Sequence, residues 1–317
     1  MYTRTNFSAF LNAETDFGLH MLRQSPVNEQ LVVSPISVIF ALAMVQAGAK
    51  GKTKNQINQV ISNGATDDAI VDFYSNLAKD TLKASNGVKT TIANAFFMDK
   101  KYTIEKPYAD TITKKYSAKV EALDFGQAKQ TAQTIDAFVS ENTAGKIKNF
   151  ITEDTVKGEL LTTTQLPLGL LRYAFSLIIN AVYFTAKWEF EFSKDSTSKK
   201  KFYSTSTSNK EISVPKMKID TDFKLKEALI SMGVTEMFSD KADLTGISKA
   251  GPLKVSDAAH RAIIEVDEEG TTAAAVSSFR VMLMSAIVGE PENFVADHPF
   301  IFILTKDNNP LFMGQFV

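Results

Sequence analysis

Apolar residues recur at helical spacing through much of the first half of the chain, a pattern typical of amphipathic helices. The first of these segments carries its apolar side chains at Phe7, Phe10, Leu11, Phe17, Leu19 and Leu22. Further amphipathic helices are predicted over residues 68–84, 106–120 and 130–150. Gly145 lies late in the last of these, so we expect that helix to end near it.

One helix is predicted to be buried on all sides. The stretch ISVIFALAMVQAGA, residues 36–49, is apolar nearly all round. Ser34 precedes it as the expected N-cap, and Pro35 takes the first helical position. Glycines end this helix, and Thr53 is expected to start a shorter one.

Strand patterns become prominent in the second half. Residues 175–184, FSLIINAVYF, form a near-continuous apolar run, which predicts a strand buried on both faces. Two more apolar strands, over residues 293–303 and 311–317, flank a polar turn at 306–310. Residues 197–214 alternate weakly and are rich in Ser, Thr and Lys, as edge strands or exposed hairpins are.

Shorter elements complete the pattern. Strands are predicted at residues 31–33, 89–98 and 120–125, and a helix at 224–232. Helices dominate the first half of the chain and strands the second, which favours the α+β class. No repeat or linker divides the sequence, so we expect one domain over residues 1–317.

Composition narrows the classes of partner. The chain has 317 residues, 44% of them hydrophobic, and a formal net charge of −1. This charge gives no electrostatic reason to expect a nucleic acid or an acidic membrane as partner. No run of eighteen apolar residues exists, so no membrane span is expected. The first residues lack the apolar core of a signal peptide, which favours a cytoplasmic location, with an extracellular one as the alternative.

The sequence gives little support for an enzyme. It has no cysteine, which excludes disulfides, thiol catalysis and cysteine-bound metal. Its three histidines are His20, His260 and His298, and none has metal-ligand spacing to another. Neither a GxSxG elbow nor a GxxxxGK[ST] loop is present. We therefore expect no catalytic activity, no cofactor and no metal.

The stretch EVDEEGTTAAAVSSFRVMLMS, residues 265–285, has an unusual composition. Alanine favours helix and threonine favours strand, so propensity predicts neither. Its small side chains would fit inside a covered sheet, where alternate residues such as Thr271, Ala273 and Ala275 would share one face. Composition alone also allows a surface loop or a short alanine helix.

Residues 268–275, EEGTTAAA, resemble the hinge of the inhibitory serpins, E-E/K-G-T-x-A-x-A-A/T. Other serpin-like motifs occur in the serpin order: SPIS at 34–37, GAKGKT at 48–53, Asn94-Ala95, NTAGKI at 142–147, NAVYF at 180–184 with Lys187-Trp188, PKMKI at 215–219, LISMG at 229–233, HRAIIEV at 260–266, DHPF at 297–300 and LFMG at 311–314. Because these motifs occur together and in the same order as in serpins, the resemblance is specific. The resemblance implies a serpin-like α+β fold with mixed sheets, about eight helices in the N-terminal half and an exposed reactive loop near residues 270–293.

The resemblance also implies functional residues. The hinge would comprise Glu268, Glu269, Gly270, Thr271, Thr272, Ala273, Ala274 and Ala275. Ser34, Ser37, Asn180 and His260 would form the hydrogen-bonded cluster called the shutter, with ordinary capping and core residues as the alternative. The reactive bond would join Met284 and Ser285, with Met282, Leu283 or Arg280 as alternatives. Trp188 could belong to a partner site or be a core residue at a strand end.

These residues imply a suicide substrate. A serine protease would cleave the loop, and the hinge would then insert into the main sheet while the protease is still bound as an acyl-enzyme. Met or Leu at the reactive bond suggests a chymotrypsin-like or elastase-like target, whereas Arg280 would suggest a trypsin-like one. We expect a monomer with no nucleic-acid or membrane partner.

Two departures from the family pattern are visible. Residues 159–173 look like extra sequence. After Val214 a serpin would continue for several dozen residues before its PKFKIE strand, but here Pro215 follows at once. The missing part corresponds in the family to central strands of the second sheet, two helices and one strand of the third. Its loss would expose former core neighbours, so the alternative function is a non-inhibitory or non-functional serpin-related protein.

Overall fold

The computed structural model describes residues 4–83, 89–157, 176–188, 191–192, 194–198, 214–271 and 295–317. Within them the α-helices are α1 (Arg4–Leu22), α2 (Pro35–Gly48), α3 (Gly51–Ser62), α4 (Asp67–Leu82), α5 (Lys106–Tyr116), α6 (Ala128–Asn142), α7 (Glu153–Lys157) and α8 (Leu225–Ser231). The strands are β1 (Leu31–Val33), β2 (Lys89–Asp99), β3 (Lys119–Leu123), β4 (Ser176–Lys187), β5 (Met217–Phe223), β6 (Asp257–Val266), β7 (Gly270–Thr271), β8 (Phe300–Lys306) and β9 (Asn309–Phe316). The predicted α+β class is confirmed.

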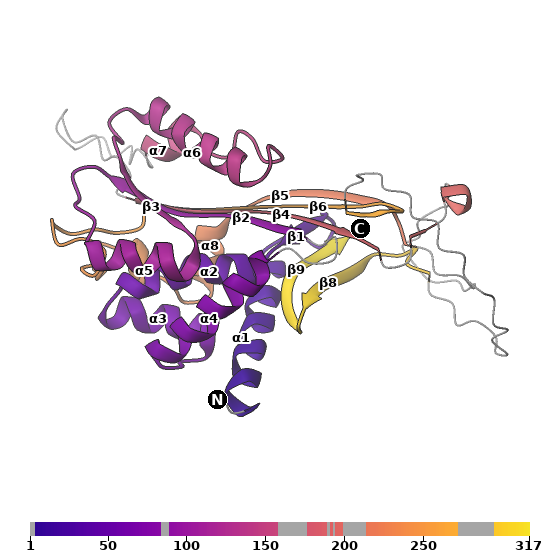
Figure 1. Cartoon of the computed structure of the whole chain (residues 1–317), viewed down its shortest axis with the longest axis horizontal. Helices are drawn as coiled ribbons and strands as arrows, with labels where there is room; N and C mark the ends of the chain where they lie inside the picture. The colour runs from indigo at the N-terminus through magenta and orange to yellow at the C-terminus, as the bar shows by residue number, and fades with distance from the viewer. Residues whose placement is uncertain are drawn as a thin grey trace.

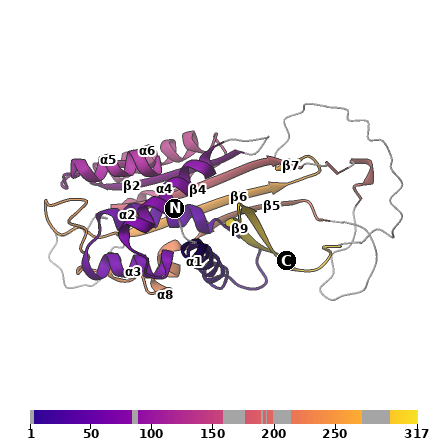
Figure 2. The ribbon, with the colours of Figure 1, turned by 60° about the horizontal axis from the view of Figure 1, so that its bottom comes forward.

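A large sheet with the order β3-β2-β4-β6-β5 forms the centre of the molecule. Figures 1 and 2 show α6 and α7 over one face of this sheet, while α1 to α5 pack beneath the other. Strand β4 is antiparallel to β2 but parallel to β6, so the C-terminal ends of β4 and β6 lie next to each other. The parallel pair is the feature that positions the candidate site.

Alternate residues of β4 face two separate hydrophobic cores. Ile178 and Val182 belong to the core shared with α2, whereas Leu177 and Ile179 belong to the core shared with α6. The residues of β4 from Ser176 to Phe184 are all buried, which confirms the predicted strand with two covered faces.

A smaller sheet with the order β1-β9-β8 packs beneath the large one (Figure 1). Strands β8 and β9 are joined by a tight turn in which Asp307 and Asn308 have φ values of 51° and 67°. Both residues tolerate this left-handed region, which suits a two-residue hairpin. One face of β8 exposes large apolar side chains, because Ile301 and Ile303 are 62% and 49% exposed.

Some predicted boundaries were wrong. Helix α3 begins at Gly51, before the expected Thr53, and Gly51 makes the bend after Lys50 with a φ of 52°, which glycine allows. Helix α6 stops at Asn142 and does not reach 150. The hairpin turn is also shorter than residues 306–310, since β8 runs to Lys306.

Candidate functional site

Three buried polar side chains lie in one row across the large sheet. Asn94 on β2 is opposite Asn180 on β4, and Asn180 is opposite His260 on β6. Asn180 and His260 are fully buried, and Asn94 is 6% exposed. Because directly opposite residues point to the same face of a sheet, the strand register alone brings these side chains together beneath it.

Asn180 is the centre of the hydrogen bonds in this row. Its Nδ2 donates to Asn94 Oδ1, to Ser37 Oγ at 2.6 Å and to the Ser37 carbonyl at 3.0 Å. Its Oδ1 lies within hydrogen-bond distance of His260 Nδ1. We call Ser34, Ser37, Asn94, Asn180 and His260 the buried polar cluster. It satisfies polar groups that would otherwise be costly to bury.

The tautomer of His260 follows from its neighbours. The Ser34 backbone N–H donates to Nε2 over 3.1 Å, so Nε2 carries no proton. Nδ1 must then carry the proton and donate to Asn180 Oδ1. Burial lowers the pKa of His260 to about 3, so the ring is neutral over the physiological range.

The N-terminus of α2 supplies the Ser34 and Ser37 groups of this cluster. Ser34 occupies the predicted N-cap position before Pro35, but its side chain makes no capping hydrogen bond. Its backbone N–H is used by His260. The predicted cap is therefore correct in position, but its side chain does not cap the helix.

The β4–β6 pairing stops before either strand ends. The last paired residues are Tyr183 and Ile263, although β4 continues to Lys187 and β6 to Val266. Strand β7 enters beside β4 at this split end and pairs antiparallel with it, Ala186 with Thr271 and Lys187 with Gly270. The chain thus leaves β6, turns back and begins an additional strand next to β4.

The turn that makes this reversal is stabilised by Asp267. Its backbone N–H donates to the Gly270 carbonyl over 2.8 Å, and its Oδ1 accepts from the N–H groups of Glu269 and Gly270 at 2.9 and 3.1 Å. Gly270 has a φ of 131°, and a Cβ there would lie 2.2 Å from the Ala186 carbonyl oxygen. Only glycine permits this approach to β4.

Charged and hydroxyl groups hold the turn from outside. Glu268 accepts from Lys216 Nζ at 2.5 Å and from Thr197 Oγ1 at 2.7 Å, and Glu269 accepts from Lys194 Nζ at 2.5 Å. We call these five residues the hinge cluster. The hydrogen bonds from Lys216 and then Thr197 lower the pKa of Glu268 to about 2. Lys194 and Lys216 are 70% and 56% exposed, whereas the Glu269 and Glu268 side chains are 18% and 10% exposed, so water screens these ion pairs from the lysine side.

Trp188 lies at the end of β4 and also contacts the turn. Its Nε1 donates to the Asp267 carbonyl over 2.8 Å, and its ring meets Phe192 edge to face. Trp188 is 39% exposed, so the interpretation as a core tryptophan was wrong. Its role is to hold the turn against the end of the strand.

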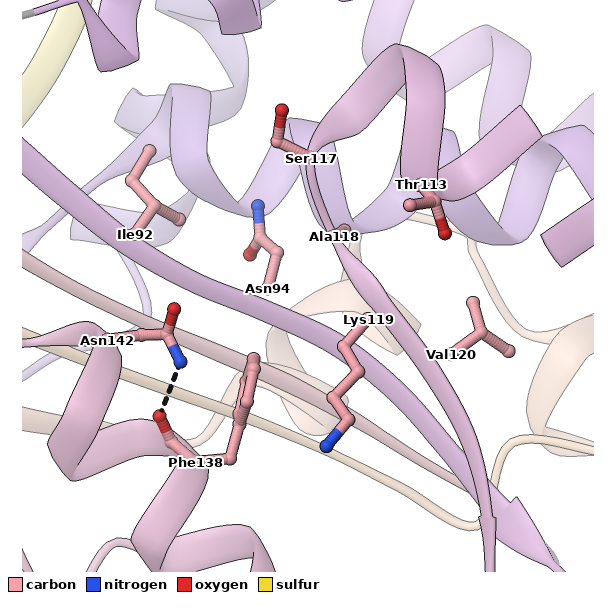
Figure 3. A pocket seen from close by; sticks show the side chains of 9 residues that line it. All are labelled: Ile92, Asn94, Thr113, Ser117, Ala118, Lys119, Val120, Phe138 and Asn142. Carbon is pink, nitrogen blue, oxygen red and sulfur yellow. Dashed lines mark hydrogen bonds between the residues drawn. The ribbon is translucent and has the colours of Figure 1, made fainter. Parts of the chain in front are cut away.

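A pocket of about 390 Å³ lies beside the buried polar cluster. Figure 3 shows Asn94 between Ser117 at the end of α5 and Phe138 on α6, with Lys119 of β3 close to Phe138. Lys119 Nζ is paired with Glu121 at 2.8 Å. Asn94 therefore links the pocket wall to the buried polar cluster, and the pocket lies beside β2 at the start of β3.

Comparison with known proteins identifies the family. A family model described as "Serpin (serine protease inhibitor)" matches residues 12–212 and 204–317. The chain belongs to the serpin family. Serpins are mostly protease inhibitors and not catalysts, so protease binding is the activity that the family implies.

Individual relatives agree with this assignment. Iripin-8 from Ixodes ricinus is 29% identical, and the alignment covers 96% of this serpin and 92% of the relative. The structure of Serpin48 from the insect Tenebrio molitor matches with a TM-score of 0.81 at 23% identity, covering 99% of each chain. Human thyroxine-binding globulin matches with a TM-score of 0.79 at 20% identity, covering 99% of this chain and 98% of that one.

The structure brings together all four residues predicted for the shutter, Ser34, Ser37, Asn180 and His260. It adds Asn94, whose Asn94-Ala95 motif was noticed in the sequence without a role. Of the predicted hinge, Glu268 to Thr271 are described, and residues 272–275 lie outside the described residues. Arg280, Met282, Leu283, Met284 and Ser285 also lie outside them, as does the segment 159–173.

Among the described residues, no group of three or more acidic or histidine side chains is arranged to hold a metal ion. Among the same residues, no helix combines the length and apolarity needed to cross a membrane.

Proposed function

We propose that this serpin inhibits serine proteases as a suicide substrate, with its hinge inserting between β4 and β6 after cleavage. The observation that carries the proposal is the short strand β7, which already lies antiparallel to β4 at the split end. The same geometry continued along β4 would make the hinge an interior strand of the sheet. The segment that moves is the one that the sequence predicts as hinge and reactive loop.

The existing register indicates how far such a strand would run. Thr271 is opposite Ala186, so continued antiparallel pairing would place Ala275 opposite Val182 and Ser277 opposite Asn180. Val281 would reach Ser176, the first residue of β4. Ten residues from 272 to 281 span about 33 Å as a strand. Cleavage at Met284–Ser285 would leave enough freed chain to cover the whole length of β4.

The same register separates the two faces of the inserted strand. Residues opposite Phe184 and Val182 would face the core beneath the sheet, and these are Ala273 and Ala275. Both are small enough to be accommodated without moving α2. Thr272 would face the other side, opposite the half-buried Thr185.

Insertion would have to break the β4–β6 ladder, whose seven residue pairs run from Leu177–Asp257 to Tyr183–Ile263. The new strand would restore those backbone hydrogen bonds on both of its edges, so the gain exceeds the loss. The hydrogen bond between His260 and Asn180 crosses this same boundary and must be exchanged for new ones. The buried polar cluster thus determines the barrier to insertion.

The proposed target class rests on the reactive bond. Met284 is followed by Ser285, and Met282 and Leu283 give a similar apolar residue if the register differs. An apolar residue at this position favours chymotrypsin-like or elastase-like proteases. Cleavage after Arg280 would instead indicate a trypsin-like target, and mass spectrometry of the cleaved chain distinguishes these sites.

The test uses Thr271→Arg, because residue 271 pairs with Ala186, which packs against the core beneath the sheet. Mixed with chymotrypsin, the unmodified serpin should give a covalent complex that survives SDS, and its cleaved form should melt at a higher temperature. Thr271→Arg should be cleaved without forming the complex, since a buried guanidinium slows insertion. An undiminished complex from this variant would refute insertion at this site.

Thr272→Arg is the matched control. It adds the same charge one residue away, on the face expected to remain half-exposed, so the complex should form as in the unmodified chain. Equal loss of complex in both variants would show that charge near the cleavage loop, and not burial, is responsible.

A non-inhibitory serpin is the second candidate. It is favoured by the exposed Ile301 and Ile303 of β8, which are what loss of core strands after Val214 would leave. Among the fold neighbours, thyroxine-binding globulin is named for ligand binding and not for inhibition. Cleavage without a rise in melting temperature would support this candidate.

A further inference from the structure

The segment that follows α6 crosses both strands at the split end, and we call its residues 143–151 the strap. Lys146 Nζ lies over the ring of Tyr183 on β4, 5.3 Å from the ring centroid. Two residues further on, the carbonyl of Lys148 accepts a hydrogen bond of 3.0 Å from Nη1 of Arg261 on β6. Tyr183 belongs to the last residue pair of β4 and β6. The strap therefore bridges the two strands where their pairing stops.

On one side the strap is fixed firmly to α6, which lies over the large sheet (Figure 1). Ile147 is fully buried in the core between α6 and the sheet, and its N–H donates to Thr143 Oγ1 over 3.2 Å. Asp136 Oδ1 of α6 accepts from the N–H groups of Phe150 and Ile151 at 2.9 and 3.0 Å. Buried side chains and hydrogen-bonded backbone are costly to expose, so the strap moves with α6.

On the other side the strap is joined to β6 by two polar contacts. One is the hydrogen bond from Arg261 to the Lys148 carbonyl. The other is the pair between Lys146 and Glu265, whose Nζ–Oε2 distance of 3.9 Å is long for an ion pair. The Lys146 side chain is 39% exposed, so water screens this pair. The hydrogen bond from Arg261 is therefore the stronger link between the strap and β6.

The guanidinium of Arg261 divides its donors between two partners. Nε and Nη2 donate to the two carboxylate oxygens of Asp220 on β5, each over 2.8 Å. Strands β5 and β6 are paired neighbours, so this contact persists when β6 moves away from β4. Nη1 is the donor directed to the strap. Arg261 thus joins a part of the molecule that moves with β6 to a part that stays with α6.

Entry of a strand between β4 and β6 would pull these two parts away from each other. Neighbouring strands lie about 4.8 Å apart, so one additional strand moves β6 about that distance further from β4. A hydrogen bond does not persist beyond about 3.5 Å, so the strap has to release one side. The contacts to β6 are fewer and more exposed than those to α6. The hydrogen bond from Arg261 is therefore the contact that breaks.

We propose that Arg261 is a positioning residue of the insertion reaction, whose hydrogen bond to the strap keeps the split end closed until a strand enters. This inference rests on the proposed function, because it concerns the rate of the same insertion. The bond has to break before the sheet widens, so it adds to the barrier without contact to the entering strand. A variant that loses only this bond should therefore insert a strand faster.

The experiment measures uptake of a synthetic peptide with the sequence of residues 272–281 by the full chain, using native electrophoresis. Arg261→Lys keeps a positive charge beside Asp220 but has a single nitrogen, so the donor to the Lys148 carbonyl is lost. Uptake should be about tenfold faster, the size expected for one partly exposed hydrogen bond from a charged donor. Asp220→Asn is the matched control, because it weakens the β5–β6 contact and leaves Nη1 on the strap. Its uptake rate should stay within about twofold of the unmodified rate.

A second pair of variants tests the weaker contact. Lys146→Met removes the pair with Glu265 and keeps an apolar stem over Tyr183. Uptake should be about twofold faster, and about twentyfold faster when this change is combined with Arg261→Lys. Lys148→Met removes an exposed charge from the same strap but keeps the carbonyl that Arg261 uses, so its uptake rate should be unchanged.

Amide hydrogen exchange shows which side of the strap opens. The N–H groups of Ile147, Phe150 and Ile151 should stay protected after peptide uptake, because they bond within the strap and to α6. Rapid exchange of these amides would show that the strap leaves α6 and keeps β6, which overturns the proposal.

Failure of the role of Arg261 and failure of the proposed function give different results. An unmodified serpin that takes up no peptide and forms no covalent complex with chymotrypsin would overturn both. If the unmodified serpin takes up the peptide at the same rate as Arg261→Lys, only the role of Arg261 is overturned. Equal acceleration in Arg261→Lys and Asp220→Asn would place the effect in the β5–β6 contact, which also overturns that role.

Discussion

Two regions hold β4 and β6 together, and they do so by different means. The buried polar cluster in the middle of the sheet consists of neutral groups, fully enclosed and mutually hydrogen-bonded. The hinge cluster at the split end uses ion pairs whose lysines are more than half exposed. Buried polar groups are costly to leave unpaired, whereas screened ion pairs are weak.

The difference indicates an order of events. Breaking Lys194–Glu269, which joins the segment after β4 to the turn after β6, costs little because Lys194 is 70% exposed and water replaces its partner. Separating His260 from Asn180 is costly until new partners are available. Strand separation should therefore begin at the split end, where β7 already lies, and reach the buried polar cluster later.

The largest effect is expected at Asn180. Asn180→Ala would leave Asn94 Oδ1, Ser37 Oγ and His260 Nδ1 without their partner. At roughly 1–3 kcal/mol for each unsatisfied group, the loss in the free energy of unfolding should be about 6 kcal/mol. Urea denaturation measures it. Thr185→Ala, at the half-buried end of the same strand, should change stability by no more than about 0.5 kcal/mol.

The second effect is a pH dependence from His260. Its pKa is about 3 in the folded chain, against 6.5 when unperturbed, so only the unfolded chain binds this proton between those values. Stability is then highest above pH 6.5 and falls as the pH drops toward 3, by about 5 kcal/mol in total. Thermal melts between pH 7 and pH 4 should show the decline, and His260→Gln should flatten it.

Glu14 must be controlled in that experiment. This residue of α1 is fully buried, neither of its carboxylate oxygens has a hydrogen-bond partner, and burial raises its pKa to about 8. It keeps its proton in the folded chain, so stability falls as the pH rises from 4.5 to 8, opposite to the His260 effect. The melts should therefore be made in Glu14→Gln. If the melting temperature still declines on acidification after His260→Gln, groups other than His260 cause the decline.

The smallest effect on stability is expected at the hinge cluster. Lys194→Met removes an exposed partner of Glu269 and should shift the melting temperature by only about 2 °C or less. It should nevertheless accelerate uptake of a synthetic peptide with the sequence of residues 272–281, because the first contact to open is weakened. Native electrophoresis follows the uptake. A slower rate than in the unmodified serpin would contradict opening from this end.

The sequence predicted β4 well because its signal is local. A continuous apolar run with two covered faces can be recognised without knowing its neighbours. The end of α6 was harder, since Ile147, Phe150 and Ile151 continue the apolar content beyond the helix. These residues join the same core from a loop, and Asp136 Oδ1 accepts from the N–H groups of Phe150 and Ile151.

The candidate site could be predicted only in part, because several of its contacts join residues that are far apart in the sequence. His260 and Asn180 could be grouped through the resemblance to serpins, but Asn94 depends on a strand register that no local pattern reveals. The use of the Ser34 N–H by His260 joins residues 226 positions apart in sequence. The position of Gly270 against β4 is equally non-local, because alanine and threonine propensities do not indicate which strand lies beside them.

Trp188 has a consequence for observing this protein at work. It is the sole tryptophan of the chain, and its indole N–H is tied to the Asp267 carbonyl at the point where β4 and β6 part. Withdrawal of that carbonyl would change the polarity around the ring. Intrinsic fluorescence therefore provides a label-free optical signal of the opening step, without any dye or added chromophore.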